Sequence, residues 1–456
     1  MPEALWWAER AWVGGGWRER VLLDVGSDGF WREVRPDVPC PETATRLHGP
    51  VLPGLVDAHS HAFQRAFVGL AERRDSAHDD FWSWRDRMYG VALRITPAQL
   101  RAVATHLYGE LLQGGYTQVC EFHYLQHDHD GRRYDDPATM CWALADAAAD
   151  AGIGLTLLPV LYERAGFTQP ALRDDQRRFA TSAADVLALQ RQINAARRPH
   201  LDAGVAIHSL RAARPESLAA VAAGAGGHPV HVHVAEQTAE VDDCLLSTGC
   251  RPIEWLARHA GLDARWQLVH ATHSTPAEIE AVAASGAGVV ICPGTEANLG
   301  DGLADLPGWL QAGVPLSVGS DSQVTRAWPE ELRWLEYGQR LALRQRNVAA
   351  APGVQGASAA RLFERMLAGG AAAAGQRCWG LQAGARADLL ALDLDDAALQ
   401  GVPPGHALDA LVFAAPARPF ARVMVAGKWV KSPPPDSDRR YRGAMAELWA
   451  AVPGPC

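Results

Sequence analysis

Two histidines, His59 and His61, lie two residues apart and follow the apolar run Val51–Val56. On a β-strand, side chains two positions apart point to the same side. Both imidazoles can therefore reach a single metal ion. A pair of this kind also occurs by chance on surfaces and in cores, so its meaning depends on further ligands elsewhere in the chain.

Three later segments carry such groups where apolar runs end. His233 ends one run, and Glu236 follows it three residues later. A carboxylate beside a metal ligand is the usual general acid and base for a metal-activated water. His270 ends the next run. The last run ends at Val318, and Asp321 lies three residues later, after Gly319 and Ser320. Asp321 can complete a coordination shell, and it can also accept a proton from the attacking water.

These residues predict one divalent ion, held by His59, His61, His233 and Asp321, with Glu236, His270 and Asp321 as the catalytic groups. Three nitrogens and one oxygen suit Zn²⁺, with Fe²⁺ as the second choice. The only two lysines, Lys428 and Lys431, lie near the C-terminus. A carboxylated lysine that bridges two metals is therefore excluded from the first 427 residues, and the site is expected to be mononuclear.

Some of these residues have simpler interpretations. His231 shares the inward face with His233 but lies about a layer deeper, so we expect a core histidine or one that supports the ligands. His273 competes with His270, although it lies beyond the expected strand. His270 itself could be a hydrogen-bonded core residue, and Asp321 could cap a turn.

The elements that must position these residues are short apolar runs that alternate with Ala- and Leu-rich helical patterns. The expected strands are 54–58, 116–122, 154–160, 204–207, 230–234, 267–271, 288–291 and 315–319. The expected helices include 97–113, 137–151, 181–196, 214–225 and 276–284. Eight strands in such alternation predict an α/β fold, a closed (β/α)₈ TIM-like barrel, with an open doubly wound sheet as the alternative. The barrel is favoured because the chemically interesting residues lie at strand C-terminal ends, where barrel active sites form.

Short strand patterns at both ends of the chain predict a small β-sandwich domain built from the two termini. They cover 4–12, 18–24 and 29–34, and then 387–393, 412–413, 421–426 and 429–430. Residues 432–438, with three prolines, are expected to be a linker before a last helix around 441–450. The expected divisions are 1–50 and 376–431 for the β domain, 51–375 for the barrel, and 432–456 for the linker and helix.

The composition is that of an ordinary globular protein: 456 residues, 48% hydrophobic, 21% charged and a formal net charge of −9. This acidic balance, without a basic block, argues against nucleic acid or an anionic membrane as a partner. No apolar stretch reaches 18 residues, and no signal peptide is visible, so we expect a cytoplasmic protein. The eight scattered cysteines form no C-x-x-C pair and are expected to be free thiols.

The ordered set of H-x-H, H-x-x-E, H and D on an eight-stranded barrel, with a β domain from both termini, resembles the amidohydrolase superfamily. The resemblance covers nearly the whole chain. It implies a metal-dependent hydrolase, and mononuclear members of this kind are mostly deaminases.

Two further segments narrow the substrate. Arg211 follows the expected fourth strand within His208–Ala212, and Arg85 lies within the aromatic segment Phe81–Tyr89. Guanidinium groups bind carboxylates in a bidentate manner, which favours an anionic substrate over a purine.

With Gln64 and the segment Glu121–Tyr124, these features are similar to the formimidoylglutamate deiminases of histidine degradation. The resemblance implies hydrolysis of N-formimino-L-glutamate to N-formyl-L-glutamate and ammonia, by attack of a metal-activated water on the formimino carbon. It also implies substrate binding by Gln64, Arg85, Tyr124, His208 and Arg211, no organic cofactor, and a homodimer. The alternatives are a mononuclear deaminase of a purine, pterin or triazine, or a barrel that binds metal or ligand without catalysis.

Overall fold

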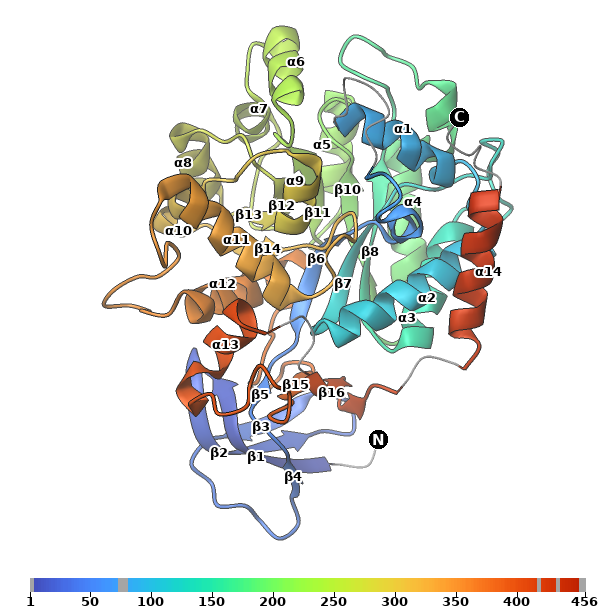
Figure 1. The fold of residues 1–456 in the computed structure, drawn as a ribbon. Coiled ribbons are helices and arrows are strands. Elements are labelled where there is room, and N and C mark those ends of the chain that lie inside the picture. The colour runs from blue at the N-terminus through green and yellow to red at the C-terminus, as the bar shows by residue number, and fades with distance from the viewer. Residues whose placement is uncertain (1–3, 73–80, 416–419, 432–434, 451–456) are drawn as a thin grey trace.

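Two β-sheets form the framework of the protein, and helices surround the larger one (Figure 1). The computed structural model describes residues 4–72, 81–415, 420–431 and 435–450. In Figure 1 the larger sheet lies above the smaller one, which carries the N-terminal strands.

The larger sheet is a parallel barrel. Its strands follow the order β6 to β8 and β10 to β14 around the circle, and β9 (Leu201–Ala203) pairs with β8 at its side. The circle closes between β6 and β14 through a parallel bridge of Ser60 with Asp321. There the amide of Asp321 donates to the carbonyl of His59 at 2.9 Å. This closure confirms the predicted barrel and excludes the open sheet. The barrel strands are β6 (Leu55–Ser60), β7 (Tyr116–His123), β8 (Gly154–Leu161), β10 (Val205–Ile207), β11 (Val230–Val234), β12 (Trp266–His270), β13 (Gly288–Ile291) and β14 (Leu316–Val318).

Helices follow most barrel strands, and several start where the sequence carries a capping signal. Thr96 caps α2 with Gln99 in a reciprocal capping box, and Pro97 occupies the first turn. Thr275, Pro276 and Glu278 repeat the pattern at α8. The helices are α1 (Phe81–Ala92), α2 (Pro97–Gln113), α3 (Thr139–Ala151), α4 (Ala183–Ala195), α5 (Pro215–Gly224), α6 (Thr238–Thr248), α7 (Pro252–His259), α8 (Pro276–Ser285), α9 (Pro293–Leu299), α10 (Leu306–Ala312), α11 (Trp328–Leu343), α12 (Ser358–Ala373), α13 (Ala407–Phe413) and α14 (Ser437–Ala450). Short 3₁₀ helices are η1 (Ala62–Phe67), η2 (Asp174–Phe179) and η3 (Pro404–His406).

The smaller sheet joins strands from both ends of the chain, as the sequence predicts. Its order is β17, β16, β15, β5, β1, β2 and β3, with β4 paired to β1. Alternating apolar residues of these strands, including Trp31, Leu389 and Met424, form a separate buried cluster. The strands are β1 (Ala4–Val13), β2 (Gly16–Val25), β3 (Trp31–Arg35), β4 (Thr45–Leu47), β5 (Val51–Leu52), β15 (Leu389–Leu392), β16 (Phe420–Val425) and β17 (Lys428–Trp429).

Two expectations near the C-terminus are wrong. Residues 412–413, predicted as a strand, end helix α13. Leu408, Leu411 and Val412 are buried there at the three- and four-residue spacing of a helix face. The predicted linker 432–438 is too long, because α14 already begins at Ser437. Residues 432–434 of that segment lie outside the described residues.

Helix α14 runs along α2 (Figure 1), where the rings of Tyr441 and His106 stack with centroids 3.9 Å apart. Among the residues that the structure describes, no helix is long and apolar enough to cross a membrane.

Candidate active site

The predicted site residues meet at the C-terminal ends of the barrel strands, where the backbone turns sharply. Ala235, His270 and Asp321 have φ values of 52°, 69° and 47°. L-residues rarely adopt this left-handed conformation, and they keep it only where the surrounding structure enforces it. These corners lie at or just after the ends of β11, β12 and β14.

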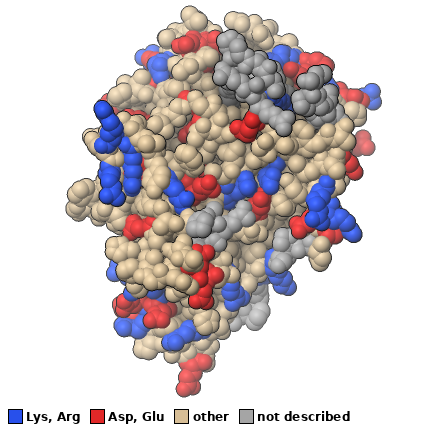
Figure 2. All heavy atoms as spheres, viewed as in Figure 1, with Lys and Arg blue, Asp and Glu red and all other residues tan. Residues whose placement is uncertain are grey.

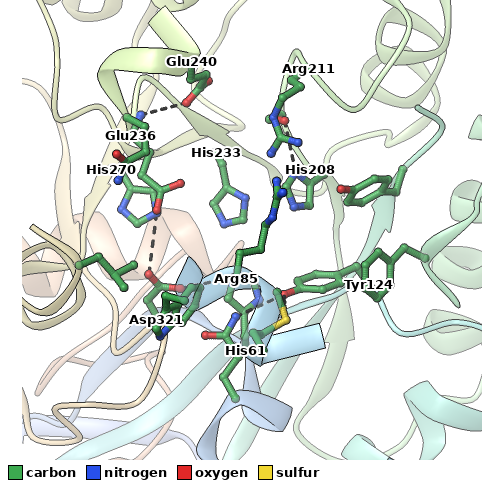
Figure 3. A pocket seen from close by; sticks show the side chains of 18 of the residues that line it. His61, Arg85, Tyr124, His208, Arg211, His233, Glu236, Glu240, His270 and Asp321 are labelled. Carbon is green, nitrogen blue, oxygen red and sulfur yellow. Dashed lines mark hydrogen bonds and ion pairs between the residues drawn. The ribbon is translucent and has the colours of Figure 1, made fainter. Parts of the chain in front are cut away.

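Three imidazoles, of His59, His61 and His233, and the carboxylate of Asp321 converge at the centre of this barrel end. Figure 3 labels His61, His233 and Asp321. The Nε2 atoms of His59 and His233 are 3.0 Å apart. Oδ1 of Asp321 lies 3.4 Å from Nε2 of His59 and 3.4 Å from Nε2 of His61. Nε2 of His270 lies 3.8 Å from Oδ2 of Asp321, so this histidine is at the edge of the cluster.

The protonation of the cluster fits a divalent cation. Burial lowers the pKa of His59 to about 3 and puts the pKa of His233 well below its usual range, so both imidazoles are neutral. The ring of His61 is oriented by its Nδ1, which donates to the carbonyl of Phe122 at 2.8 Å and leaves the lone pair on Nε2. Burial alone would raise the pKa of Asp321, but His59 and His270 hold it below its usual range. Neutral nitrogens and a carboxylate that face one another at these distances form a donor set suited to Zn²⁺.

A layer of buried polar groups supports the ligands from below. Asp57 accepts hydrogen bonds from the amide of Ser320 at 2.9 Å and from its hydroxyl at 2.5 Å. Glu121 accepts hydrogen bonds from the hydroxyl of Ser60 at 2.7 Å and from the amide of Ala62 at 2.6 Å. These bonds tie the segment that carries His59 and His61 to the neighbouring strands.

Glu236 and His270 form a second pair beside the cluster. Oε1 of Glu236 lies 3.7 Å from Nε2 of His270. Burial raises the pKa of Glu236 to about 7, the range in which a carboxyl group can both accept and donate a proton. Burial would lower the pKa of His270, but Glu236, Glu296 and Asp321 raise it to about 10.

The cavity above the cluster has a cationic side. Arg85 on α1 and Arg211, which follows β10, both line it (Figure 3). Burial lowers the pKa of Arg85, and the nearby Arg211 and Arg173 lower it further. Nη1 of Arg211 donates to the carbonyl of Ala165 at 3.4 Å, so the side chain is held at the cavity wall. Two guanidinium groups in one cavity are suited to bind the carboxylates of an anionic ligand.

Polar and aromatic groups form the cavity wall between the candidate metal ligands and the two arginines. Gln64 donates to the hydroxyl of Tyr124 at 3.3 Å, and its buried Oε1 has no hydrogen-bond partner among the residues that the structure describes. The ring of His208 packs against Tyr124 and Tyr162, with centroids 5.7 and 4.4 Å away. Trp84, Tyr89 and Phe179 complete the apolar lining.

The structure therefore brings the predicted residues together around one cavity, with His59 beneath its floor. His231 lies outside the cavity, as expected: it is fully buried, and its Nε2 is 2.9 Å from the carbonyl of Ala373. His273 does not line the cavity.

Sequence reasoning missed three buried carboxylates around the site. Glu240 on α6 accepts hydrogen bonds from the amides of Ala235 and Glu236 at 3.2 and 3.1 Å, and so fixes the corner after β11. Glu296 on α9 contacts His270. Asp301 accepts a hydrogen bond from Gln237. A weak signal existed, since all three follow barrel strands on the side that carries the site.

The strong charges of the site lie inside the molecule. On the face shown in Figure 2, basic and acidic residues are interspersed over the surface and do not gather into a large patch of one sign.

Comparisons with known proteins agree with this arrangement. A model of the amidohydrolase family matches residues 51–430. A curated formimidoylglutamate deiminase of Pseudomonas aeruginosa is 47% identical over 93% of this chain and 93% of its own length. The crystal structure of an amidohydrolase from Brucella melitensis is 39% identical, covers 98% of this chain and 100% of its own, and superposes with a TM-score of 0.92. An adenosine deaminase from Xanthomonas campestris with bound zinc shares the fold, with a TM-score of 0.80, 23% identity and coverage of 98% and 99%.

Proposed function

The chain belongs to the amidohydrolase family, and from this premise we propose that it is a formimidoylglutamate deiminase. It hydrolyses the C–N bond of N-formimino-L-glutamate and releases N-formyl-L-glutamate and ammonia, a step of histidine degradation. The observation that carries this proposal is the extent of its likeness to a curated formimidoylglutamate deiminase, which spans nearly the whole of both chains.

The metal site proposed for this reaction consists of His59, His61, His233 and Asp321. Their converging nitrogens and carboxylate oxygen support one divalent ion per chain, with Zn²⁺ as the first choice and Fe²⁺ as the second. When bound there, such an ion lowers the pKa of a water molecule and polarises the carbon–nitrogen double bond. No organic cofactor is needed.

The proton transfers are assigned to the groups beside the cluster. Water attacks the formimino carbon, and Glu236 or Asp321 takes a proton from it. Glu236 then gives a proton to the nitrogen that leaves, the tetrahedral carbon collapses, and the C–N bond breaks with release of ammonia. A carboxyl group with a pKa of about 7 suits both directions of transfer. His270, at 3.7 Å from Glu236, stabilises the charge that develops on this carboxylate.

Recognition of the glutamate part is assigned to the cationic side of the cavity. Arg211 and Arg85 bind the two carboxylates, and Gln64, with Tyr124 and His208, orients the substrate between them. The buried amide oxygen of Gln64 is available for this, since it has no hydrogen-bond partner within the described part of the chain. Guanidinium groups suit this task because they donate two parallel hydrogen bonds to one carboxylate.

Ammonia release from purified protein tests the proposal. Turnover of N-formimino-L-glutamate with equimolar N-formyl-L-glutamate and ammonia is the expected result. Preferred turnover of a purine, pterin or triazine would instead establish the second candidate, and the aromatic lining of Trp84 and Tyr89 is the observation that favours it. Metal binding without release of ammonia from any of these compounds would indicate a non-catalytic barrel.

We also propose a homodimer in the cytoplasm. The cysteines that the structure describes are free thiols, which suits a reducing compartment. Light scattering coupled to gel filtration would detect twice the mass of the 49.1 kDa chain.

A further inference from the structure

We propose that Glu296 is a positioning residue for His270: its carboxylate accepts a hydrogen bond from Nδ1 of the imidazole and thereby aims Nε2 at the reacting groups. The kinetic part of this inference rests on the proposed deiminase function. The structural part concerns the side chain of His270 alone and can be tested without turnover.

The carboxylate of Glu296 is itself fixed in place. Glu296 lies in the first turn of α9, just after β13, and only 4% of the residue is exposed. Its Oε1 accepts a hydrogen bond from the amide of Cys292 at 2.9 Å, and its own amide donates to the carbonyl of Cys292 at 2.9 Å. This reciprocal pair of bonds leaves the carboxylate little freedom to move.

The same Oε1 lies 3.3 Å from Nδ1 of His270. On the opposite edge of the ring, Nε2 faces Oε1 of Glu236 at 3.7 Å and Oδ2 of Asp321 at 3.8 Å. Each ring nitrogen therefore faces carboxylate oxygen: Nδ1 faces Glu296, and Nε2 faces Glu236 and Asp321. Figure 3 shows the ring of His270 beside Glu236 and above Asp321.

An imidazole in this position needs such a partner. Rotation about its second side-chain torsion is broad and roughly two-fold, so packing alone does not decide which nitrogen faces the cavity. The backbone of His270 is already in the left-handed conformation, with φ of 69°. Glu296 is thus the contact that selects the ring orientation.

Two substitutions separate positioning from simple structural support. Glu296→Ala removes the partner of His270, and kcat should fall about 10- to 100-fold while KM changes less than about twofold, the range found for groups that orient catalytic ligands. Glu296→Gln keeps an oxygen that can accept a hydrogen bond from Nδ1. The fall in log kcat for this variant should be no more than about half of that for Glu296→Ala. Activities are compared per mole of bound metal.

The matched control is Glu278→Ala. Glu278 is 3% exposed and accepts hydrogen bonds from the amides of Thr275 and Glu254, but it caps α8 and does not line the cavity. Glu278→Ala should lower the melting temperature without a selective fall in kcat. Equal falls in kcat for the Glu296 and Glu278 variants would show that any lost buried carboxylate has this effect, and the inference would be wrong.

A double variant tests whether Glu296 acts through His270. His270→Asn with Glu296→Ala should be no slower than His270→Asn alone. If the fold-losses in kcat of the two single variants multiply in the double variant, Glu296 acts independently of His270. If the loss of Glu296→Ala vanishes once activity is normalised to bound metal, Glu296 serves metal retention. Either result refutes the positioning role.

A spectroscopic measurement on the holoenzyme needs no substrate. In ¹⁵N-histidine multiple-bond spectra, the signal that disappears in His270→Asn should report a hydrogen-bonded proton on Nδ1 in the wild type, and the chemical shifts of this nitrogen and proton should change in Glu296→Ala. Unchanged shifts refute the inference. If the wild type fails to hydrolyse N-formimino-L-glutamate but the spectra behave as expected, the proposed function fails and the positioning role stands.

Discussion

Replacement of Arg211 by alanine tests the substrate assignment most directly. Arg211 is partly buried in the cavity wall, on the side away from the candidate metal ligands (Figure 3). If its guanidinium binds a substrate carboxylate, Arg211→Ala leaves that carboxylate desolvated and without its partner. The adjacent Arg85 cannot replace it, because each guanidinium is assigned to one of the two carboxylates.

The size of the effect follows from the burial of the pair. Truncation of one partner of a buried, hydrogen-bonded charge pair costs about 2–5 kcal/mol. Because Arg211 is only partly buried, solvent screening keeps the expected loss near the lower end, at about 2–3 kcal/mol. Since 1.36 kcal/mol corresponds to a factor of ten, kcat/KM for N-formimino-L-glutamate should fall about 30- to 150-fold. Arg211→Lys should remain impaired, because an ammonium group lacks the planar fork of guanidinium.

The assay compares N-formimino-L-glutamate with an amidine that has no carboxylate. The second compound should be a poor substrate for the wild type and should lose little with Arg211→Ala. A small loss is expected even there, because Arg211 opposes the effect of burial on the pKa of Glu236. Arg214→Ala is the matched control, since Arg214 is exposed in the same connection and does not line the cavity. Equal losses on both compounds would refute the reasoning and make Arg211 a support of the barrel.

Three further outcomes are expected. Glu236→Gln should keep the fold and the metal but lose about 10²- to 10⁴-fold in kcat, because a carboxamide cannot shuttle protons; near-normal turnover would make Asp321 the base. Elemental analysis should find about one divalent ion per chain, and its removal by a chelator should abolish turnover and lower the melting temperature; two ions that are both needed for activity would disprove a mononuclear site. Burial lowers the pKa of His123 from 6.5 to about 3, so the folded state resists a proton that the unfolded state accepts, and stability falls as the pH drops below 6.5. By this linkage His123 accounts for about 2 kcal/mol of the fall in the free energy of unfolding between pH 7 and pH 5. In urea unfolding at pH 7 and at pH 5, the fall should be smaller by that amount in His123→Gln than in the wild type.

The sequence was sufficient for the barrel because each strand is an apolar run with its own boundaries. The predicted 230–234 is the observed β11, and 288–291 is β13. Predicted and observed ends of the other barrel strands differ by at most two residues, and the predicted 315–319 shortens by one residue at each end to Leu316–Val318. Buried parallel strands read as continuous hydrophobic segments, and this makes them visible without knowledge of their neighbours.

Short segments failed where tertiary contacts decide the structure. Residues 412–413 are β-branched and aromatic, which favours a strand in isolation. In the folded protein they end a helix that buries Leu408 and Leu411 on the same face. The two-residue strand β5 was missed for the opposite reason: Val51 and Leu52 form a strand only because β1 and β15 come from the two ends of the chain to pair with them.

The supporting carboxylates could not be predicted because their roles depend on backbone corners. Ala235, His270 and Asp321 are not glycines, so nothing in their residue types announces a positive φ. Glu240 acquires its function only because the turn at Ala235 presents two successive amides to it. The same holds for Glu296, which depends on the turn after β13 to approach His270.

The two arginines occupy one end of the cavity, and this asymmetry decides how an anionic substrate can bind. Arg85 and Arg211 lie at the wall away from the candidate metal ligands. In a partly dry cavity such charges act with a lower dielectric constant than in water. A molecule with carboxylates at one end is stabilised when they point at the arginines, whereas the reverse orientation places them beside Glu236 and Asp321. Under the proposed assignment, the orientation that satisfies the arginines brings the formimino carbon to the catalytic groups, so binding of the glutamate part would also align the reaction.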